Sequence, residues 1–209
     1  MSSKPSARES ATKKEKDLSK SPIRAPKEVL DRICGRAHYL TTQMIWLANK
    51  RAEKEKGDPK TGGHPAACAS ALHITGALHL IVKSGFDYIA NKPHAAPVDH
   101  SYNYLMKLML KNGGHHGHPV EFLGQNLDRL SQDEMDQAME GLRKFAENGE
   151  PVFQSYHSAY DSDHHGFLPT GTVGIPPVNA GYLAHAYRFA KDHGYDVPEA
   201  HFWSILGDS

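Results

Sequence analysis

The stretch that decides the fold class is His201-Phe202-Trp203-Ser204-Ile205-Leu206, followed by Gly207-Asp208-Ser209. Its apolar part favours a β-strand, and the Gly-Asp-Ser that follows is typical of a loop. Residues 87–91 are a second short strand candidate. Helical patterns separate the two candidates, and strands that alternate with helices indicate an α/β fold with a parallel sheet flanked by helices. Since a loop and a helix normally follow such a strand, we expect this domain to be incomplete at its C-terminus.

The helical segments are indicated by apolar residues that recur at steps of three and four. The second segment begins with a proline, which the first turn of a helix tolerates. The fourth begins with a capping box, in which Ser131 is followed three residues later by Glu134. We expect helices near residues 26–57, 65–83, 97–113, 131–145 and 176–194.

Residues 1–26 differ in composition from the rest of the chain. They are rich in Ser, Lys and Pro, carry seven basic and three acidic residues, and contain few large apolar side chains. Such a segment cannot bury enough apolar surface to offset its ordering entropy, so we expect a flexible basic tail. The sequence therefore predicts a tail at 1–26 and a single α/β domain at 27–209.

Composition excludes several classes of protein. Lys plus Arg equals Asp plus Glu, at 24 each, which gives no support to a nucleic-acid or anionic-membrane partner. No uninterrupted apolar run approaches the length of a membrane span, and the N-terminus lacks the apolar centre of a secretory signal. The two cysteines do not make a disulfide framework. We expect a cytoplasmic chain that acts on a small molecule.

Four short motifs carry side chains that are able to do chemistry. Glycine lets a backbone approach a ligand closely, and a helix start presents free N–H groups to an anion. A nearby histidine can bind phosphate or move a proton, and an Asp just beyond a strand can hold Mg²⁺. The motifs are Gly62-Gly63-His64-Pro65, Lys92-Pro93-His94-Ala95, Pro169-Thr170-Gly171-Thr172-Val173-Gly174 and Gly207-Asp208-Ser209.

In this order, the motifs resemble the N-terminal diphosphate-binding domain of the transketolase family. The chain is most similar to its homodimeric branch, the bacterial first component of the pyruvate dehydrogenase complex. The resemblance implies an enzyme that uses thiamine diphosphate and Mg²⁺ to cleave a C–C bond next to a carbonyl. Ketol transfer, as in transketolase, and decarboxylation of a 2-oxo acid both stay open.

The resemblance also implies roles for particular residues. His64 and His94 would face the diphosphate and the thiazolium and move protons. Tyr156 and His157 lie in a loop where relatives place a substrate-facing histidine or tyrosine. Asp208 would be the first protein ligand of Mg²⁺. The remaining cofactor contacts would come from Gly171, Val173, Gly174, Gly207 and Ser209.

The chain departs from the family pattern at Ser209, where the family has glycine, and at Lys92, where close relatives have a neutral residue. The family's second Mg²⁺ ligand and its activating glutamate lie in sequence beyond these residues. The resemblance therefore implies that activity needs further sequence or a partner chain, as a homodimer or with a complementary subunit. We expect no turnover by these 209 residues alone.

Two other functions stay open. The chain could be an inactive binding or regulatory relative that keeps the fold without the chemistry. It could instead be a histidine-rich metal-binding protein, since it has 15 histidines. Imidazoles at short spacing bind Zn, Ni or Cu, and two clusters suit that reading: His115, His116 and His118, and His164 with His165.

Overall fold

The computed structural model describes residues 25–50, 56–57, 60, 62–84, 86–111, 129–140, 142, 153, 156–158, 161, 163, 168–171 and 173–207. Apart from residues 25 and 26, the predicted flexible tail lies outside the described residues. The elements in chain order are α2 (Lys27–Lys50), α3 (Pro65–Ala77), the π-helical turn η1 (Leu78–Val82), β1 (Tyr88–Ala90), the 3₁₀ turn η2 (Pro93–Ala95), α4 (Ala96–Met106), α5 (Gln132–Met139), α6 (Ile175–Asp192) and β2 (Phe202–Ser204).

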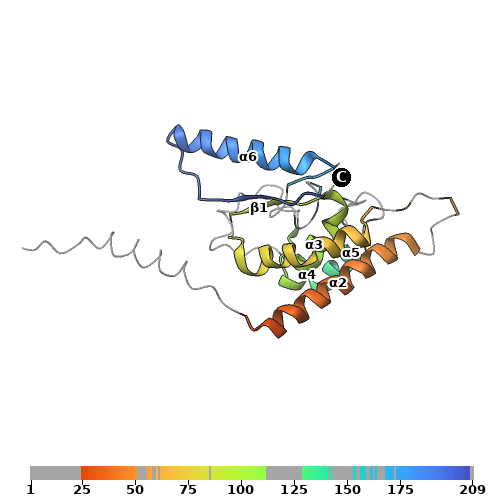
Figure 1. The fold of residues 1–209 in the computed structure, drawn as a ribbon. Coiled ribbons are helices and arrows are strands. Elements are labelled where there is room, and N and C mark those ends of the chain that lie inside the picture. The colour runs from red at the N-terminus through yellow and green to blue at the C-terminus, as the bar shows by residue number, and fades with distance from the viewer. Residues whose placement is uncertain are drawn as a thin grey trace, which may run out of the picture.

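The two strands, β1 and β2, pair in parallel with Ile89 opposite Trp203. Helix α6 packs on both strands, and helices α2 to α5 lie on the other side of them (Figure 1). Mixed α/β structure with parallel strands is therefore confirmed, as are the strand predictions near 87–91 and 201–206. Strand β2 is only partly buried, with the side chain of Ser204 exposed.

The side chain of Asp87 joins the two strands at their amino ends. Its Oδ2 accepts a hydrogen bond from Trp203 Nε1 at 2.9 Å, and its Oδ1 accepts from the His201 backbone N–H at 2.9 Å. The Ser84 hydroxyl donates to the same Oδ1 at 2.7 Å. Burial alone would raise the pKa of this carboxyl, but these donors together lower it to about 2.

The helices enclose a core whose largest buried side chains include Met44, Tyr102 and Phe153. The capping box of α5 is confirmed, because Ser131 Oγ accepts from the Glu134 N–H and the Glu134 carboxylate accepts from the Ser131 N–H. Helix α4 ends at Met106, well before the predicted residue 113. The reason is Lys107, which adopts the left-handed conformation with φ 55° and terminates the helix.

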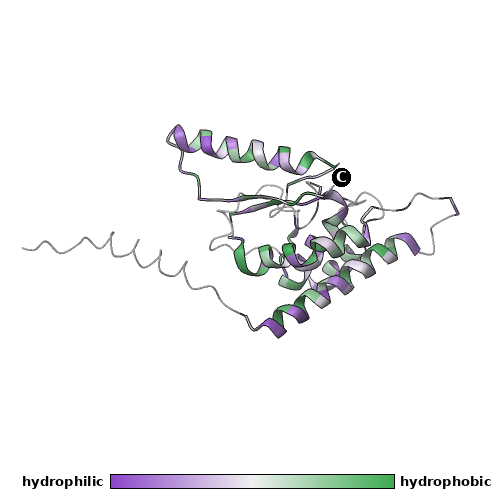
Figure 2. Cartoon of the chain, in the orientation of Figure 1, coloured by the Kyte–Doolittle hydropathy of each residue, from purple (hydrophilic) through white to green (hydrophobic). Residues whose placement is uncertain are grey.

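The continuous helical stretch Pro65–Val82, formed by α3 and η1, is 18 residues long and apolar enough by length and composition to cross a membrane. Hydrophobic residues run along most of it (Figure 2). A core helix meets the same criterion, and α3 packs against α2 and α4 with Cys68 and Leu72 buried. The expectation that the chain has no membrane span stays a prediction.

Gly76 lets α3 and α4 approach closely. A Cβ at this position would clash with the Tyr102 hydroxyl and lie 3.0 Å from Tyr102 Cζ. That hydroxyl is buried and donates to the Leu72 carbonyl at 3.1 Å, so Tyr102 has little freedom to move. At Gly35 in α2, by contrast, an added Cβ would meet no atom of the described residues within 4 Å.

We predict that Gly76→Ala destabilises the protein whereas Gly35→Ala stabilises it. Overpacking costs about 1–3 kcal/mol, which exceeds the gain of about 1 kcal/mol that alanine brings to a helix. At Gly35 only the gain in helix propensity applies, because an added Cβ meets no atom of the described residues there. Urea unfolding followed by circular dichroism measures both variants, and a Gly76→Ala protein as stable as Gly35→Ala would contradict this packing.

We also predict that Asp87→Asn lowers the free energy of unfolding at neutral pH by about 1–3 kcal/mol, because it removes a charged acceptor of several hydrogen bonds. Since the folded-state pKa is depressed, the carboxylate stabilises the fold above pH 3.8 and loses that effect as the pH falls towards 2. The difference between wild type and variant should therefore shrink over that range.

The matched control for Asp87 is Asp31→Asn. This carboxylate pairs with Lys27 on the exposed surface of α2. Ion pairs this exposed are screened by water and contribute little to stability, so the control should change unfolding little. Equal effects of the two substitutions at neutral pH would show that Asp87 does not join the strands as described.

Candidate functional site

A cavity of about 590 Å³ lies beyond the carboxyl ends of β1 and β2. The residues that follow each strand form part of its wall, and the first turns of α3 and α6 form the rest. Parallel α/β folds bind ligands at this end of the sheet. The lining residues are His64, Ala66, Ala67, Ser70, Lys92, Pro93, His94, Val173, Gly174, Pro176, Pro177, Ile205, Leu206 and Gly207.

The cavity brings together residues from all four sequence motifs. His64, His94, Val173, Gly174 and Gly207 all line it. These residues are far apart in the sequence, so the motifs become neighbours only through the parallel pairing of the strands and the placement of the helices.

The predicted site residues that do not line the cavity lie in different places. Tyr156 lies next to it, since its ring meets the His94 ring edge-on with 5.6 Å between centroids. Gly171 is exposed in the loop that leads to Val173. Asp208 and Ser209 lie outside the described residues, so the structure gives no account of the predicted Mg²⁺ ligand.

The two histidine loops are joined through their backbones. The His64 N–H donates to the His94 carbonyl at 3.0 Å, and the Cys68 thiol donates to the same carbonyl at 3.3 Å. Burial raises the pKa of the Cys68 thiol to about 12, which disfavours the thiolate that a nucleophile needs. Gly63 has φ 88°, and a Cβ there would lie 3.0 Å from Pro97 Cγ, so the turn requires glycine.

The polar groups on the cavity wall suit an anion. His64, Lys92 and His94 supply basic side chains, and no acidic residue is present among the described residues that line it. The Lys92 ammonium donates to Ser70 Oγ at 2.6 Å across the wall. Helix α3 begins at the cavity without a side-chain cap, so the first-turn N–H groups of Ala66 and Ala67 are available to a ligand.

A buried carboxylate, Asp99 of α4, lies beneath the loop of residues 91–94. Asn91 Nδ2 donates to it at 2.8 Å, His157 Nε2 at 2.7 Å and His79 Nε2 at 3.3 Å. Burial by itself would raise the pKa of Asp99, but the hydrogen bonds from His157 and His79 outweigh it and lower the pKa. Asp99 was not among the residues predicted from the sequence. The one feature that could have indicated it is an acidic residue directly after the apolar residues that open α4.

The position of His157 differs from the expectation that it faces a substrate. Its ring is buried under the cavity and bonded to Asp99, with 3% of the residue exposed. The Thr170 N–H donates to the His157 carbonyl at 3.2 Å, which ties the third motif to this loop. Its neighbour Tyr156 is the residue that reaches His94, and the buried position of His157 favours a structural role.

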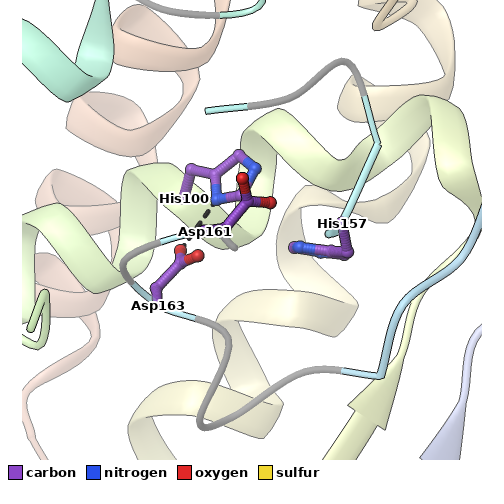
Figure 3. A group of neighbouring side chains, drawn as sticks. All are labelled: His100, His157, Asp161 and Asp163. Atoms are coloured by element: carbon purple, nitrogen blue, oxygen red, sulfur yellow. Dashed lines mark hydrogen bonds and ion pairs between the residues drawn. The ribbon is translucent and has the colours of Figure 1, made fainter. Parts of the chain in front are cut away.

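His157 also belongs to a second group of side chains, with His100, Asp161 and Asp163 (Figure 3). All four are buried, and one potential ligand atom from each lies within 4.8 Å of the others. His100 Nδ1 and Asp163 Oδ2 are 2.7 Å apart. Burial raises the pKa of Asp161 to about 6, while the charge of Asp163, together with those of Asp161 and Asp99, overcomes burial and raises the pKa of His100. This group has the ligand types of a metal site.

The histidine clusters that the sequence singled out lie outside the described residues. These are His115, His116 and His118, and His164 with His165. The described cluster instead uses His100 and His157 with Asp161 and Asp163, and Asp163 directly precedes the His164-His165 pair in the sequence. His157, Asp161 and Asp163 lie beside His100 of α4, which brings the four side chains together (Figure 3).

Comparison of the chain with known protein families, characterised proteins and solved structures gives no match. The resemblance to the transketolase family therefore rests on the motifs and stays a prediction.

We predict that Asp99→Asn destabilises the fold by about 1.5–3 kcal/mol, because it removes the buried charge to which three segments donate hydrogen bonds. Asp136→Asn is the matched control, since that exposed carboxylate accepts from Tyr104 and Gln132 on the surface. Urea unfolding of both variants is the measurement. A loss at Asp99 no larger than at Asp136 would contradict the importance of the buried network.

Proposed function

We propose that this chain is the diphosphate-binding part of a thiamine-diphosphate- and Mg²⁺-dependent enzyme that cleaves a C–C bond next to a carbonyl. The observation that carries the proposal is the convergence of four motifs on one cavity beyond two parallel strands. The motifs come from distant parts of the sequence, and they were chosen only for their residue types. Residues of all four motifs can contact one ligand only if they line the same cavity.

The cavity fits the chemistry of a diphosphate joined to a ring system. Its basic side chains and the uncapped start of α3 supply charge-assisted donors for phosphate oxygens. Its other wall is apolar, formed by Val173, Ile205 and Leu206. A volume of about 590 Å³ falls within the range of small-molecule sites.

When bound, thiamine diphosphate would supply a thiazolium whose deprotonated form adds to a carbonyl and whose ring accepts the electron pair of the broken C–C bond. The residues of this chain would bind the cofactor and orient it. Lys92 and the α3 backbone N–H groups would hold the diphosphate, and the imidazoles of His64 and His94 would hold or move a proton. The edge-on ring of Tyr156 fixes the orientation of His94.

The resemblance assigns Mg²⁺ to Asp208 and further residues to a partner chain, as a homodimer or with a complementary subunit. Two observations are compatible with a partner at the cavity mouth. Val173 is 63% exposed and Leu206 is 59% exposed, although both are apolar and both line the cavity. Apolar groups left in water at a site mouth favour cover by a ligand or by another chain. A ketose phosphate and a 2-oxo acid are both open as substrates.

We predict that the chain binds thiamine diphosphate with Mg²⁺ and binds thiamine, which lacks the diphosphate, much more weakly. Isothermal titration calorimetry measures both. Lys92→Gln and His64→Gln should each weaken binding of thiamine diphosphate by about 10- to 100-fold, the worth of one hydrogen bond to a charged group. Inorganic diphosphate should compete with the cofactor.

The control is Lys191→Gln, which removes an exposed positive charge from the last turn of α6. It should leave the affinity unchanged. Equal affinity for thiamine and thiamine diphosphate would refute a diphosphate site, and so would variants at Lys92 and His64 that bind like wild type. Binding of the cofactor by a completed assembly without any turnover would instead favour the inactive relative.

A further inference from the structure

We propose a second ligand site, in which the cluster of His100, His157, Asp161 and Asp163 binds one divalent transition-metal ion, zinc by preference, in a closed structural site. The site is separate from the Mg²⁺ that the resemblance assigns to Asp208. It goes beyond the proposed function, because it holds the fold beside the cavity and takes no part in the reaction.

The spacing of the four side chains suits a metal shell. One nitrogen or oxygen from each side chain lies within 4.8 Å of the other three. Ligands at the usual zinc distances of about 2.0–2.2 Å are about 3.4 Å from one another in a tetrahedron. His100 comes from α4, and His157, Asp161 and Asp163 lie against it (Figure 3). The Asp163 carboxylate, which accepts from His100 Nδ1 in this structure, has to turn away from that nitrogen to bring the four ligand atoms to that spacing.

Two buried polar atoms in the cluster have no hydrogen-bond partner among the described residues. They are His100 Nε2 and Asp163 Oδ1. Both residues are 0% exposed. Each uses its other polar atom in the bond between His100 Nδ1 and Asp163 Oδ2. A buried acceptor without a partner is costly, and a cation supplies the missing interaction.

The hydrogen bonds around the cluster orient the imidazoles as metal ligands. A carboxylate only accepts, so His157 donates Nε2–H to Asp99 and its neutral ring then carries the lone pair on Nδ1. A carboxylate behind a ligating histidine is the usual second layer of a metal site. Asp99 is itself held by Asn91 and His79.

The charge and the surroundings favour a divalent ion in a closed site. Asp161 and Asp163 bring two carboxylates into the interior, where charges need a counter-charge. The ring of Phe153 stacks on His100 with 3.8 Å between centroids, which closes one side. Two imidazoles and two carboxylates in a buried group supply the nitrogen and oxygen ligands of a four-coordinate zinc site, although without the cysteines that structural zinc sites commonly use.

The full chain, purified without metal-affinity steps, is loaded with Zn²⁺ or with Co²⁺ as a spectroscopic probe. We expect one tightly held equivalent, an intense visible absorption of four-coordinate Co²⁺, and a higher thermal midpoint with Zn²⁺. Asp163→Asn should lower the affinity by at least about 100-fold, because loss of a ligand exceeds the 10- to 100-fold effect of losing its second-layer partner.

His38→Gln is the matched control, because it removes an exposed imidazole from α2. It should leave the stoichiometry and the Co²⁺ spectrum unchanged. If Asp163→Asn fails to fold by circular dichroism, the wild-type Co²⁺ spectrum decides the question. Weak six-coordinate absorption, or retention of the tight equivalent in a folded Asp163→Asn protein, would overturn the proposal and assign the metal to other histidines.

The proposal of a metal site and the proposal of a cofactor cavity can be refuted independently. Loss of the metal site in Asp163→Asn leaves the residues of the cavity wall in place, so binding of thiamine diphosphate tests the cavity alone. Lys92→Gln should in turn bind Co²⁺ like wild type.

Discussion

The buried charge of Asp99 is the interaction on which both sites depend. A buried carboxylate needs hydrogen-bond donors. Here the donors are Asn91 after β1, His79 in η1, and His157. Because these groups have to meet at one point, the loop that carries Lys92 and His94 is held against α4. The wall of the cavity and the buried cluster are therefore fixed by the same carboxylate.

The cavity and the buried cluster have opposite chemistry. The cavity is open, its polar groups are basic or are backbone donors, and it suits an anion. The cluster is closed, it contains two carboxylates with two imidazoles, and it suits a cation. Tyr156 and His157 are adjacent in the chain and contact one site each.

Local patterns predicted much of the fold. The parallel strands, the capping box at Ser131 and the start of α6 at its paired prolines depend on nearby residues, and the structure agrees with them. Of the site residues that the motifs suggested, His64, His94, Val173, Gly174 and Gly207 line one cavity, whereas Tyr156, His157 and Gly171 do not. Asp87, Asp99 and Asp163 were not identified, because each of them has a hydrogen-bond partner at least 58 residues away in the sequence. A lone acidic residue in an apolar run does not indicate which donor will meet it.

The most direct test of the central claim is a crystal structure of the chain with thiamine diphosphate and Mg²⁺. Diphosphate density should lie in the cavity, within hydrogen-bond distance of Lys92 and of the first N–H groups of α3. His64 and His94 should face the thiazolium. Density for the cofactor elsewhere on the chain, or an empty cavity at saturating cofactor, would contradict the account.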